Sequence, residues 1–430
     1  MQGPRDETVF IGIFFRGLVF SCQKVKFLSM RSFTSLMIAT ILSMALAAAH
    51  QIPFIDLADD YYRQVLVDHE VGQYLGHPTT CLLDDGRTIL TVFPKGHGRG
   101  GIVYKRSTDG GQTWSERLPT PKSWLTSKEV PTLHRMTDAS GKKRIIMFSG
   151  LHPIRMSVSE DEGATWTELE AIGDFGGIVA MGCHMEVRGK PGHYFCLFHD
   201  DGRFLEPDAK RAKPVHFKLL QTNSTDGGLT WSKPKVIQES SKIHLCEPGI
   251  IRSPDGKRLA VLLRENSRSK NSHIIFSDDE GESWSEPREL PLSLTGDRHT
   301  GQYGPDGRLF ISFRGISPGN QVMGSGEVTG PMPNAGDWSG WVGTWDDLES
   351  GNPGQYVVRI MDNKKGHDTT YPGVEVLPDG TFVTVTYGHW TKGEAPYIMC
   401  VRFTLKELDA KAKKSSKVTL SDDWKKVSNQ

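Results

Sequence analysis

One eight-residue pattern, S-x-D-x-G-x-[ST]-W, occurs four times along the chain. Its copies start at Ser107, Ser159, Ser224 and Ser277, at intervals of 52, 65 and 53 residues. The Asp can accept amide bonds in a tight turn, the Gly can take a positive φ, and the Trp can bury its ring against a neighbouring sheet. An EF-hand also spaces Asp and Gly, but no copy has the flanking helices or the final Glu of that loop. Repeats at this spacing predict the blades of a β-propeller.

A second repeat, independent of the first, is a turn between two apolar strands. Asp-Gly between alternating hydrophobic runs is a strong hairpin signal. Six such turns occur, at Asp85-Gly86, Ser140-Gly141, Lys190 to Gly192, Asp255-Gly256, Asp306-Gly307 and Asp379-Gly380. The eight-residue box follows the turn in the first four units. We therefore predict an all-β chain, a six-bladed β-propeller with four Asp-box hairpins. The Gly-rich segment 317–351 in the fifth unit is predicted to be a long functional loop.

The N-terminal residues carry an export signal. Residues 30–49 combine a basic Arg31, an apolar stretch and a small-residue end, which is typical of a secretory signal peptide. We expect Met30 to be the true start, with a membrane-anchored precursor as the alternative. The expected organisation is leader and signal peptide over 1–49, propeller over 50–405 and a charged, solvated tail over 406–430. The mature chain is expected to be secreted or periplasmic, without a stable membrane span.

Charge and cysteine content narrow the classes of partner and cross-link. The 430 residues include 51 Lys+Arg and 51 Asp+Glu, so net charge gives no reason to expect nucleic acid as a partner. Five cysteines remain after the leader, and an odd number gives no complete disulfide framework. Cys183 and Cys196 flank one hairpin turn and are either a pair or buried small side chains.

The hairpins also supply a register for residues that face the propeller axis. Counting eight residues back from the hairpin Asp gives His77, Glu247, Arg298 and Tyr371. The same count gives Thr132 in the second unit and Cys183 or His184 in the third. The opposite rim of the pocket should follow the second strand of each unit, and its candidates are Lys95, His97, His152, His199, Asp200, Asp201, Arg264, Glu265, Arg314, Tyr387 and His389.

These residue types favour recognition of an acidic sugar. Arg264 and Arg298 can clamp a carboxylate, which matches the planar guanidinium fork. A Tyr opposite a Glu makes a nucleophile with its base, since the carboxylate can take the phenol proton. Arg314 is a further candidate for the substrate carboxylate, with a solvated or ion-paired role as its alternative.

Two segments resemble those of a known family. HLCEPGIIRSPDGKRLAVLLREN is similar to the sialidase (neuraminidase) segment with the catalytic Glu and, seventeen residues on, the second Arg of a carboxylate-binding triad. TTYPGVEVLPDGTFVTVTY is similar to the segment with the nucleophilic Tyr. The chain thus resembles the sialidase superfamily over roughly residues 70 to 405. The resemblance implies Tyr371 as nucleophile, Glu247 as base, and Arg264 with Arg298 on the carboxylate.

Two of the seven groups expected from this resemblance are absent. Gly76-His77-Pro78 stands where the family has Arg-Ile-Pro, so the first Arg of the triad is missing. The loop before the first Asp box offers Lys95, His97 and Arg99 in place of the acid/base Asp. We therefore expect His77, His97 or Asp200 to act as the acid.

Three functions are compatible with these residues. The first is a secreted exo-sialidase-like glycoside hydrolase that acts on an acidic sugar of a glycan. The second is a polysaccharide lyase acting on uronates, which is favoured by the histidines His77, His97, His184, His199, His244, His299 and His389. The third is a glycan-binding propeller without catalysis. No cofactor is expected, and no closely spaced His pair supports a metal site.

Overall fold

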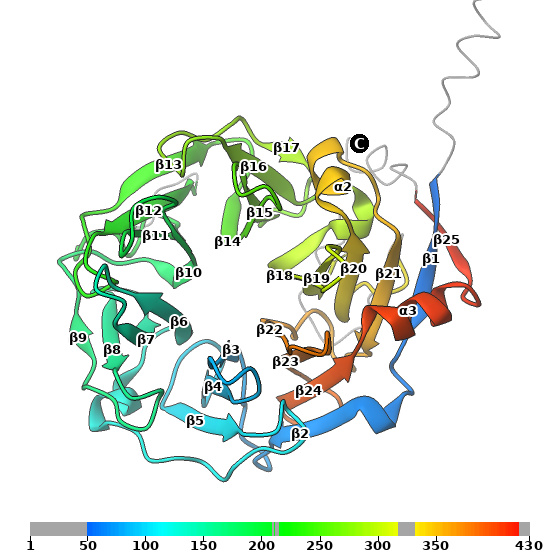
Figure 1. Cartoon of the computed structure of the whole chain (residues 1–430), viewed down its shortest axis with the longest axis horizontal. Helices are drawn as coiled ribbons and strands as arrows, with labels where there is room; N and C mark the ends of the chain where they lie inside the picture. The colour runs from blue at the N-terminus through cyan, green and yellow to red at the C-terminus, as the bar shows by residue number, and fades with distance from the viewer. Residues whose placement is uncertain (1–49, 209, 211–214, 317–331, 421–430) are drawn as a thin grey trace, which may run out of the picture. The chain divides into compact units, whose positions relative to one another are not determined.

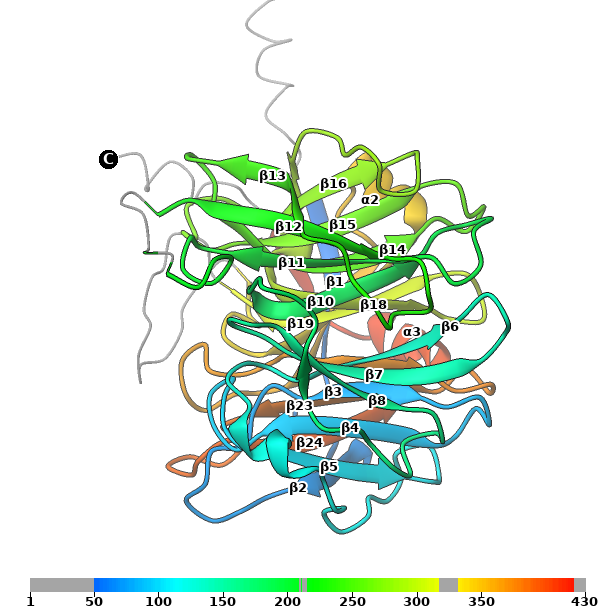
Figure 2. The same ribbon diagram turned by 90° about the vertical axis from the view of Figure 1, so that its left-hand side faces the viewer.

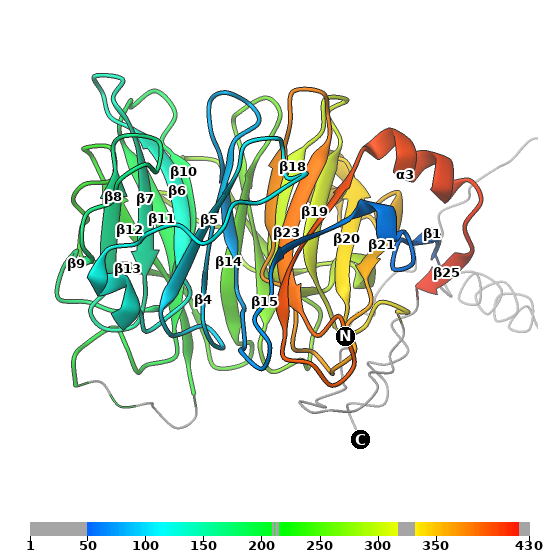
Figure 3. The ribbon, with the colours of Figure 1, turned by 90° about the horizontal axis from the view of Figure 1, so that it is seen from below.

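The computed structural model describes residues 50–208, 210, 215–316 and 332–420. Six sheets follow one another around a central axis (Figure 1). Seen from the side, the strands run from one face of this ring to the other (Figure 2, Figure 3). The six-bladed β-propeller predicted from the two repeats is confirmed.

The first four blades are built from consecutive, antiparallel strands, ordered from the axis outward. Blade 1 contains β3 (Thr79–Leu82), β4 (Ile89–Pro94) and β5 (Ile102–Ser107). Blade 2 contains β6 (Thr132–Thr137), β7 (Lys143–Ser149), β8 (Arg155–Ser159) and β9 (Glu170–Ala171). Blade 3 contains β10 (Ile178–Glu186), β11 (Tyr194–Asp200), β12 (Phe217–Ser224) and β13 (Lys235–Ser240). Blade 4 contains β14 (Leu245–Arg252), β15 (Leu259–Glu265), β16 (His273–Ser277) and β17 (Arg288–Glu289).

The last blade combines strands from both ends of the described chain. It contains β22 (Gly373–Val376), β23 (Phe382–Gly388), β24 (Tyr397–Phe403) and, outermost, β2 (Gln64–Asp68). β2 pairs antiparallel with β24, for example Gln64 with Val401. This pairing closes the ring through backbone hydrogen bonds.

Blade 5 is wider than the sequence predicted. It contains β18 (Gly296–Tyr303), β19 (Leu309–Gly315), β20 (Trp338–Gly343) and β21 (Tyr356–Met361), followed by β1 (His50–Asp56) and β25 (Lys417–Leu420). β20 and the helix α2 (Trp345–Ser350) occupy the second half of the segment that was expected to be a long loop. Its first half, residues 317–331, lies outside the described residues.

The solvated tail expected after residue 405 is ordered up to residue 420. The helix α3 (Leu405–Ala412) begins with a capping box, in which Thr404 and Glu407 bond each other's backbone amides. Leu405 and Leu408 are buried in a cluster with residues of blades 5 and 6. β25 then pairs antiparallel with β1. The high proportion of charged residues in this segment led us to expect a solvated tail, although the segment contains a capping box and a short strand.

Each Asp box is held by its own side chains. In the first box, the Ser107 hydroxyl donates to Asp109 Oδ1 at 2.8 Å and accepts the Gly111 amide at 2.8 Å. The Thr113 hydroxyl donates to Asp109 Oδ2 at 2.6 Å. The same Ser–Asp bond recurs at Asp161, Asp226 and Asp279. The four boxes are therefore self-stabilised turns.

The Trp side chains of the later boxes pack on the preceding blade. Trp231 is buried and lies 5.6 Å from Phe148 of blade 2, measured between ring centroids. Trp166 lies 5.9 Å from Tyr104 of blade 1, and Trp284 lies 6.2 Å from Phe195 of blade 3. The Trp side chains of these boxes thus pack against a neighbouring sheet, as predicted from the sequence, and stabilise the contact between blades.

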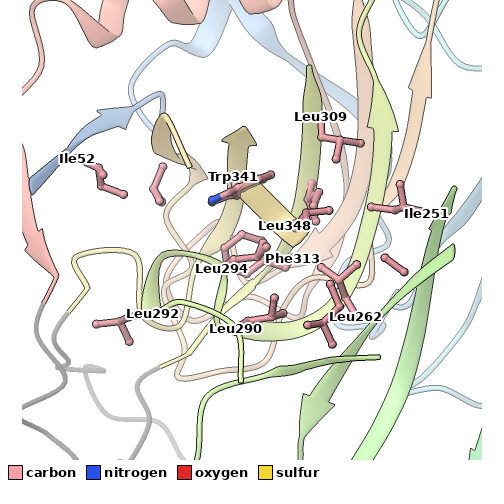
Figure 4. Close-up of a cluster of buried hydrophobic side chains, with 14 of the residues drawn as sticks. Ile52, Ile251, Leu262, Leu290, Leu292, Leu294, Leu309, Phe313, Trp341 and Leu348 are labelled. Carbon is pink, nitrogen blue, oxygen red and sulfur yellow. The ribbon is translucent and has the colours of Figure 1, made fainter. Parts of the chain in front are cut away.

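Hydrophobic clusters fill the spaces between blades. The cluster in Figure 4 joins Ile251 and Leu262 of blade 4 to Leu309, Phe313 and Trp341 of blade 5. Ile52 of β1 packs against the same cluster, so the first described strand is part of the core. Burial of this apolar surface holds the ring together.

Two expectations concern cross-links and membranes. Every cysteine in the described part of the chain is free. Cys183 and Cys196 do not face each other across the hairpin, since Cys183 lies opposite Leu197 and Cys196 lies opposite His184. None of the described helices is long and apolar enough to cross a membrane. The signal peptide expected over residues 30–49 lies outside the described residues.

Candidate active site

Three of the four register positions share an uncommon backbone conformation. His77, Glu247 and Arg298 have φ values of 54°, 52° and 55°. Strand pairing skips from Cys246 to Gly249 in blade 4 and from Asp297 to Thr300 in blade 5, so Glu247 and Arg298 lie on β-bulges. Positive φ at residues other than Gly is uncommon and clusters at functional sites, as do bulges that re-aim side chains. In blade 6 the positive φ, 59°, falls on Thr370, directly before Tyr371.

Tyr371 and Glu247 meet across the axis from blades 6 and 4. The Tyr371 hydroxyl donates a short hydrogen bond to Glu247 Oε1. Arg264 Nη1 donates to the same oxygen at 2.7 Å. The contact expected from the register is therefore present. The second carboxylate oxygen, Oε2, is buried and has no partner among the described residues.

The protonation states of this pair follow from its surroundings. Burial raises the pKa of Tyr371 well above its ordinary value, and the negative charge of Glu247 adds to the shift. Burial alone would raise the pKa of Glu247, but Arg264 and the other neighbouring donors outweigh it and leave that pKa lowered. At neutral pH the pair is thus a phenol beside a carboxylate that can accept its proton.

Three arginines converge on Asp297, a fully buried carboxylate that the sequence argument missed. Arg268 Nη2 lies 2.8 Å and Arg314 Nη2 lies 2.6 Å from Asp297 Oδ2, and Arg264 Nε lies 3.3 Å from Oδ1. These cations hold the pKa of Asp297 well below its ordinary value against the effect of burial. The one feature of the sequence that could have identified Asp297 is that it directly precedes Arg298, a residue found by counting back from the hairpin turn.

The arginine cluster (Arg264, Arg268 and Arg314) carries one more positive charge than Asp297 and Glu247 together neutralise. His367 packs beside it, and both of its ring nitrogens are buried without a partner among the described residues. Burial and the nearby arginines lower the pKa of His367 to about 4, so it is neutral. The site is therefore net positive and retains unsatisfied polar atoms.

The sequence placed Arg314 and Arg298 on the substrate carboxylate, and the structure uses them differently. Arg314 donates through Nε and Nη2 to Asp297 and through Nη1 to the carbonyls of His367 and Thr369. Its side chain is occupied by protein acceptors. Arg298 is separate from the arginine cluster, and its Nη1 donates to the Pro248 carbonyl at 3.4 Å.

His77 lies beside the nucleophile candidate as a neutral imidazole. Its ring centroid is 4.3 Å from that of Tyr371. Its Nδ1 accepts the Gly98 amide at 3.1 Å, so the proton is on Nε2, which lies 3.3 Å from the Tyr387 hydroxyl. Burial lowers the pKa of His77 well below its ordinary value. The predicted acid in blade 1 is therefore an uncharged group.

Asp368, which the sequence argument also missed, organises the rim near His77. It accepts the Tyr74 hydroxyl at 2.6 Å and lies 2.9 Å from His389 Nε2. His97 Nδ1 is 2.7 Å from the Tyr74 hydroxyl. Burial would raise the pKa of Asp368, but its bonds with His389, His97 and Tyr74 lower it, so it is a carboxylate. His97 and His389 thus join one network at this rim.

Glu129 is an acidic group close to the loop of His97, and it has no ion pair among the described residues. It lies in the connection between blades 1 and 2, where its Oε1 accepts the Val130 amide at 2.8 Å and adjoins Gly98. Burial raises its pKa to about 7; the charge of Glu247 raises it further, whereas His97 acts in the opposite direction. No motif marks Glu129, because it belongs to neither repeat.

Other predicted residues make structural contacts. Asp200 accepts the amides of Gly202, Phe204 and Leu205 at 3.0–3.2 Å, so it stabilises a turn. His199 stacks on Phe217 and accepts the Glu247 amide through Nδ1 at 3.4 Å, and His299 stacks on Phe313. His184 bonds His134 further along the axis. Of the histidines that favoured a lyase, His77, His97, His199 and His389 therefore lie at the site, whereas His184 and His299 line the axis elsewhere. No group of three or more potential metal ligands occurs among the described residues.

Comparison with known proteins agrees with this architecture. Residues 154–313 match the BNR repeat-like domain family, and residues 105–116 match the BNR/Asp-box repeat. A sialidase from Clostridium perfringens is 24% identical over 268 residues, which cover 56% of each protein. The chain thus matches about half the length of that curated relative.

Solved structures show the same fold at low identity. A protein of unknown function from Dyadobacter fermentans has a TM-score of 0.61 at 14% identity, over 79% of this chain and 97% of that one. The NanB sialidase from Streptococcus pneumoniae has a TM-score of 0.55 at 12% identity, over 80% and 71%. The intramolecular trans-sialidase from Ruminococcus gnavus has a TM-score of 0.52 at 14% identity, over 78% and 95%. The chain is thus a six-bladed β-propeller with BNR repeats, and it is similar to sialidases in sequence and in fold.

Proposed function

We propose that this protein is a retaining glycoside hydrolase that acts on an acidic sugar of a glycan. The observation that carries the proposal is the hydrogen bond from Tyr371 to Glu247 beside Arg264. A nucleophile, its base and a cation that holds the base ionised are the parts that covalent catalysis by a phenol needs. Relatives named as sialidases support the reaction class, although the sugar of this chain is inferred from its own pocket.

The reaction has two steps. In the first, Glu247 takes the phenol proton while Tyr371 attacks the anomeric carbon, and the leaving oxygen receives a proton from an acid. In the second, water releases the sugar from Tyr371 with the roles reversed. Because the pKa of Tyr371 is raised, the proton leaves during the attack and no free phenolate accumulates.

Glu129 fits the role of the acid better than the residues expected from the sequence. His77 is neutral and Asp200 holds a turn, whereas Glu129 has a pKa of about 7 and remains partly protonated at neutral pH. It adjoins Gly98 of the loop in which the family places its acid. A carboxylic acid whose pKa lies near the working pH is an efficient proton donor.

The charge of the pocket favours an anionic substrate. The arginine cluster pairs with Asp297 and Glu247 alone among the described carboxylates, so one positive charge is in excess. A sugar carboxylate would neutralise this excess in a site with little water.

The test is a turnover assay on aryl glycosides of N-acetylneuraminate and glucuronate. We expect one of them to be hydrolysed and Tyr371→Phe to reduce turnover by several orders of magnitude while leaving the melting temperature unchanged, since only the phenol oxygen is lost. A fluorinated glycosyl fluoride of the same sugar should label Tyr371, as read by peptide mass spectrometry. Near-normal turnover by Tyr371→Phe would reject the proposal, and an unsaturated product absorbing in the ultraviolet would assign a lyase instead.

A further inference from the structure

A separate cavity of about 220 Å³ lies along the axis of the propeller. All six inner strands contribute to its wall. In blades 4 and 6 the wall residues follow Glu247 and Tyr371 in the chain, whereas Arg298 of blade 5 occupies the same register position as those two residues. Neither Tyr371, Glu247 nor the arginine cluster lines it. The cavity therefore has a lining of its own and lies next to the candidate active site.

Arg298 lies at the inner end of this cavity without a counter-charge. Its side chain is 6% exposed, and its carbon Cζ is 5.8 Å from the centre of the Tyr371 ring. Among the described residues no carboxylate forms an ion pair with it, whereas each member of the arginine cluster pairs with Asp297. A buried charge without a partner is strongly unfavourable. The cavity is thus suited to an anion.

The bulge in β18 produces this arrangement. Asp297 and Arg298 are consecutive, but Asp297 joins the arginine cluster and Arg298 lines the cavity. Gly182 makes room for the guanidinium, because a Cβ at that position would lie 3.1 Å from Arg298 Nη1. A side chain there would crowd the arginine.

Two histidines in the wall are neutral and leave one acceptor free. His134 Nε2 lies 3.0 Å from the Met181 carbonyl, which can only accept, so that nitrogen carries the proton. His134 Nδ1, 2.9 Å from His184 Nδ1, is then the acceptor. It follows that His184 Nε2 is unprotonated and keeps its lone pair. Burial lowers the pKa of His184 to about 4, so the imidazole is not the missing charge.

The rest of the wall is rich in groups that bind hydroxyls. Thr300 and Gln302 line the cavity, and neither side chain has a hydrogen-bond partner among the described residues. Glu375 accepts the Thr80 hydroxyl at 2.7 Å, and burial raises its pKa to about 7. Gln302 is exposed, which places the open end of the cavity near it.

From this combination we propose that the axial cavity binds a monosaccharide-sized sugar acid, with its carboxylate on Arg298. Its hydroxyl groups would bond Thr300, Gln302 and His184 Nε2. A bare inorganic ion would use only Arg298 and leave most of the cavity to water, since a water molecule accounts for only about 30 Å³ of liquid. This site does not depend on the hydrolase activity proposed above.

The test is calorimetric titration in chloride-free buffer with D-glucuronate, N-acetylneuraminate and sulfate as probes. We expect a sugar acid to bind the cavity, and Arg298→Gln to weaken that event at least tenfold. Arg264→Lys, in the other pocket, should leave it intact. Gln302→Ala should weaken the sugar acid several-fold and leave sulfate unchanged. Without ligand, Arg298→Gln should melt at the same or a higher temperature than the parent, because it removes an unpaired buried charge.

Several results would overturn the proposal. One is that the parent and Arg298→Gln bind the sugar acid with equal affinity, and another is that the parent does not bind it. A third is that sulfate binds as tightly as the sugar acid and that Gln302→Ala has no effect. If Arg298→Gln does not fold, the same calorimetric titration is made with Thr300→Val and Gln302→Ala. Unchanged sugar-acid affinity in both of these variants would then reject the site.

Discussion

Asp297 and Arg298 are neighbours in the chain, yet their side chains serve two different sites. Asp297 binds the three members of the arginine cluster, and Arg298 lines the axial cavity. The bulge between Asp297 and Thr300 separates them. The positive charge around the propeller axis is thus divided between a cluster that carboxylates partly neutralise and a single unpaired arginine.

Asp297→Asn should destabilise the protein by about 3–5 kcal/mol, because it leaves buried arginines without their anion. Denaturant unfolding would measure the loss, and Asp208→Asn, an exposed position, is the control. The pKa of Asp297 is lowered in the folded state, so its contribution is present above the unfolded pKa of about 4 and is lost as pH falls toward the folded pKa. Equal stability of the two variants would show that the cluster does not need this carboxylate.

Glu129→Gln should lower turnover by about 10²–10⁴-fold on substrates with poor leaving groups. Aryl glycosides with acidic leaving groups need no proton and should be much less affected. Since Glu129 acts protonated and has a pKa of about 7, activity of the parent should fall as pH rises above 7. The variant should lose this alkaline limb in a pH–rate profile. Exposed Glu116→Gln is the control, and an unchanged alkaline limb in Glu129→Gln would assign the acid elsewhere.

Trp231→Ala should cost about 3–5 kcal/mol of unfolding free energy, as for other buried aromatic residues. Trp114→Ala should cost less, because Trp114 is only partly buried. Guanidinium titrations would measure both, with Tyr62→Ala, at a position 75% exposed, as the control. Lost turnover at unchanged stability would instead place the Asp box in the active site.

Leu408→Ala should cost about 2–5 kcal/mol of unfolding free energy, because the Leu408 side chain of α3 is fully buried. Lys406→Ala, on an exposed position of the same helix, should change stability little. Thermal melting of the two variants tests whether the helix is part of the core. Similar melting temperatures of the two variants would show that α3 is not part of the core, in agreement with the solvated tail expected from the sequence.

The mature protein should begin near His50 if residues 30–49 are a cleaved signal peptide. Mass spectrometry of secreted or periplasmic material would identify the first residue. The apolar run that ends at Ala47-Ala48-Ala49 is the reason for this expectation. Recovery of residues 1–29 in the mature chain would contradict it.

The sequence determined the blades because both repeats are local. A hairpin at Asp379-Gly380 or a box at Asp109 is set by turn chemistry within a few residues, and the box Trp needs only a neighbouring sheet. The register placed Tyr371 opposite Glu247 for the same reason, since each lies at a fixed distance from its turn.

Only the tertiary structure decided which charges pair. Asp297 and Glu129 belong to no motif, and their roles come from cations, carboxylates and burial contributed by other blades. The closing strand β2 and the pair β1–β25 depend on backbone contacts between distant segments. The bulge in β18 directs the Arg298 side chain away from Arg264, with which the sequence had grouped it. Turns and strand periodicity are set by neighbouring residues, whereas the pairing of buried charges depends on the whole ring.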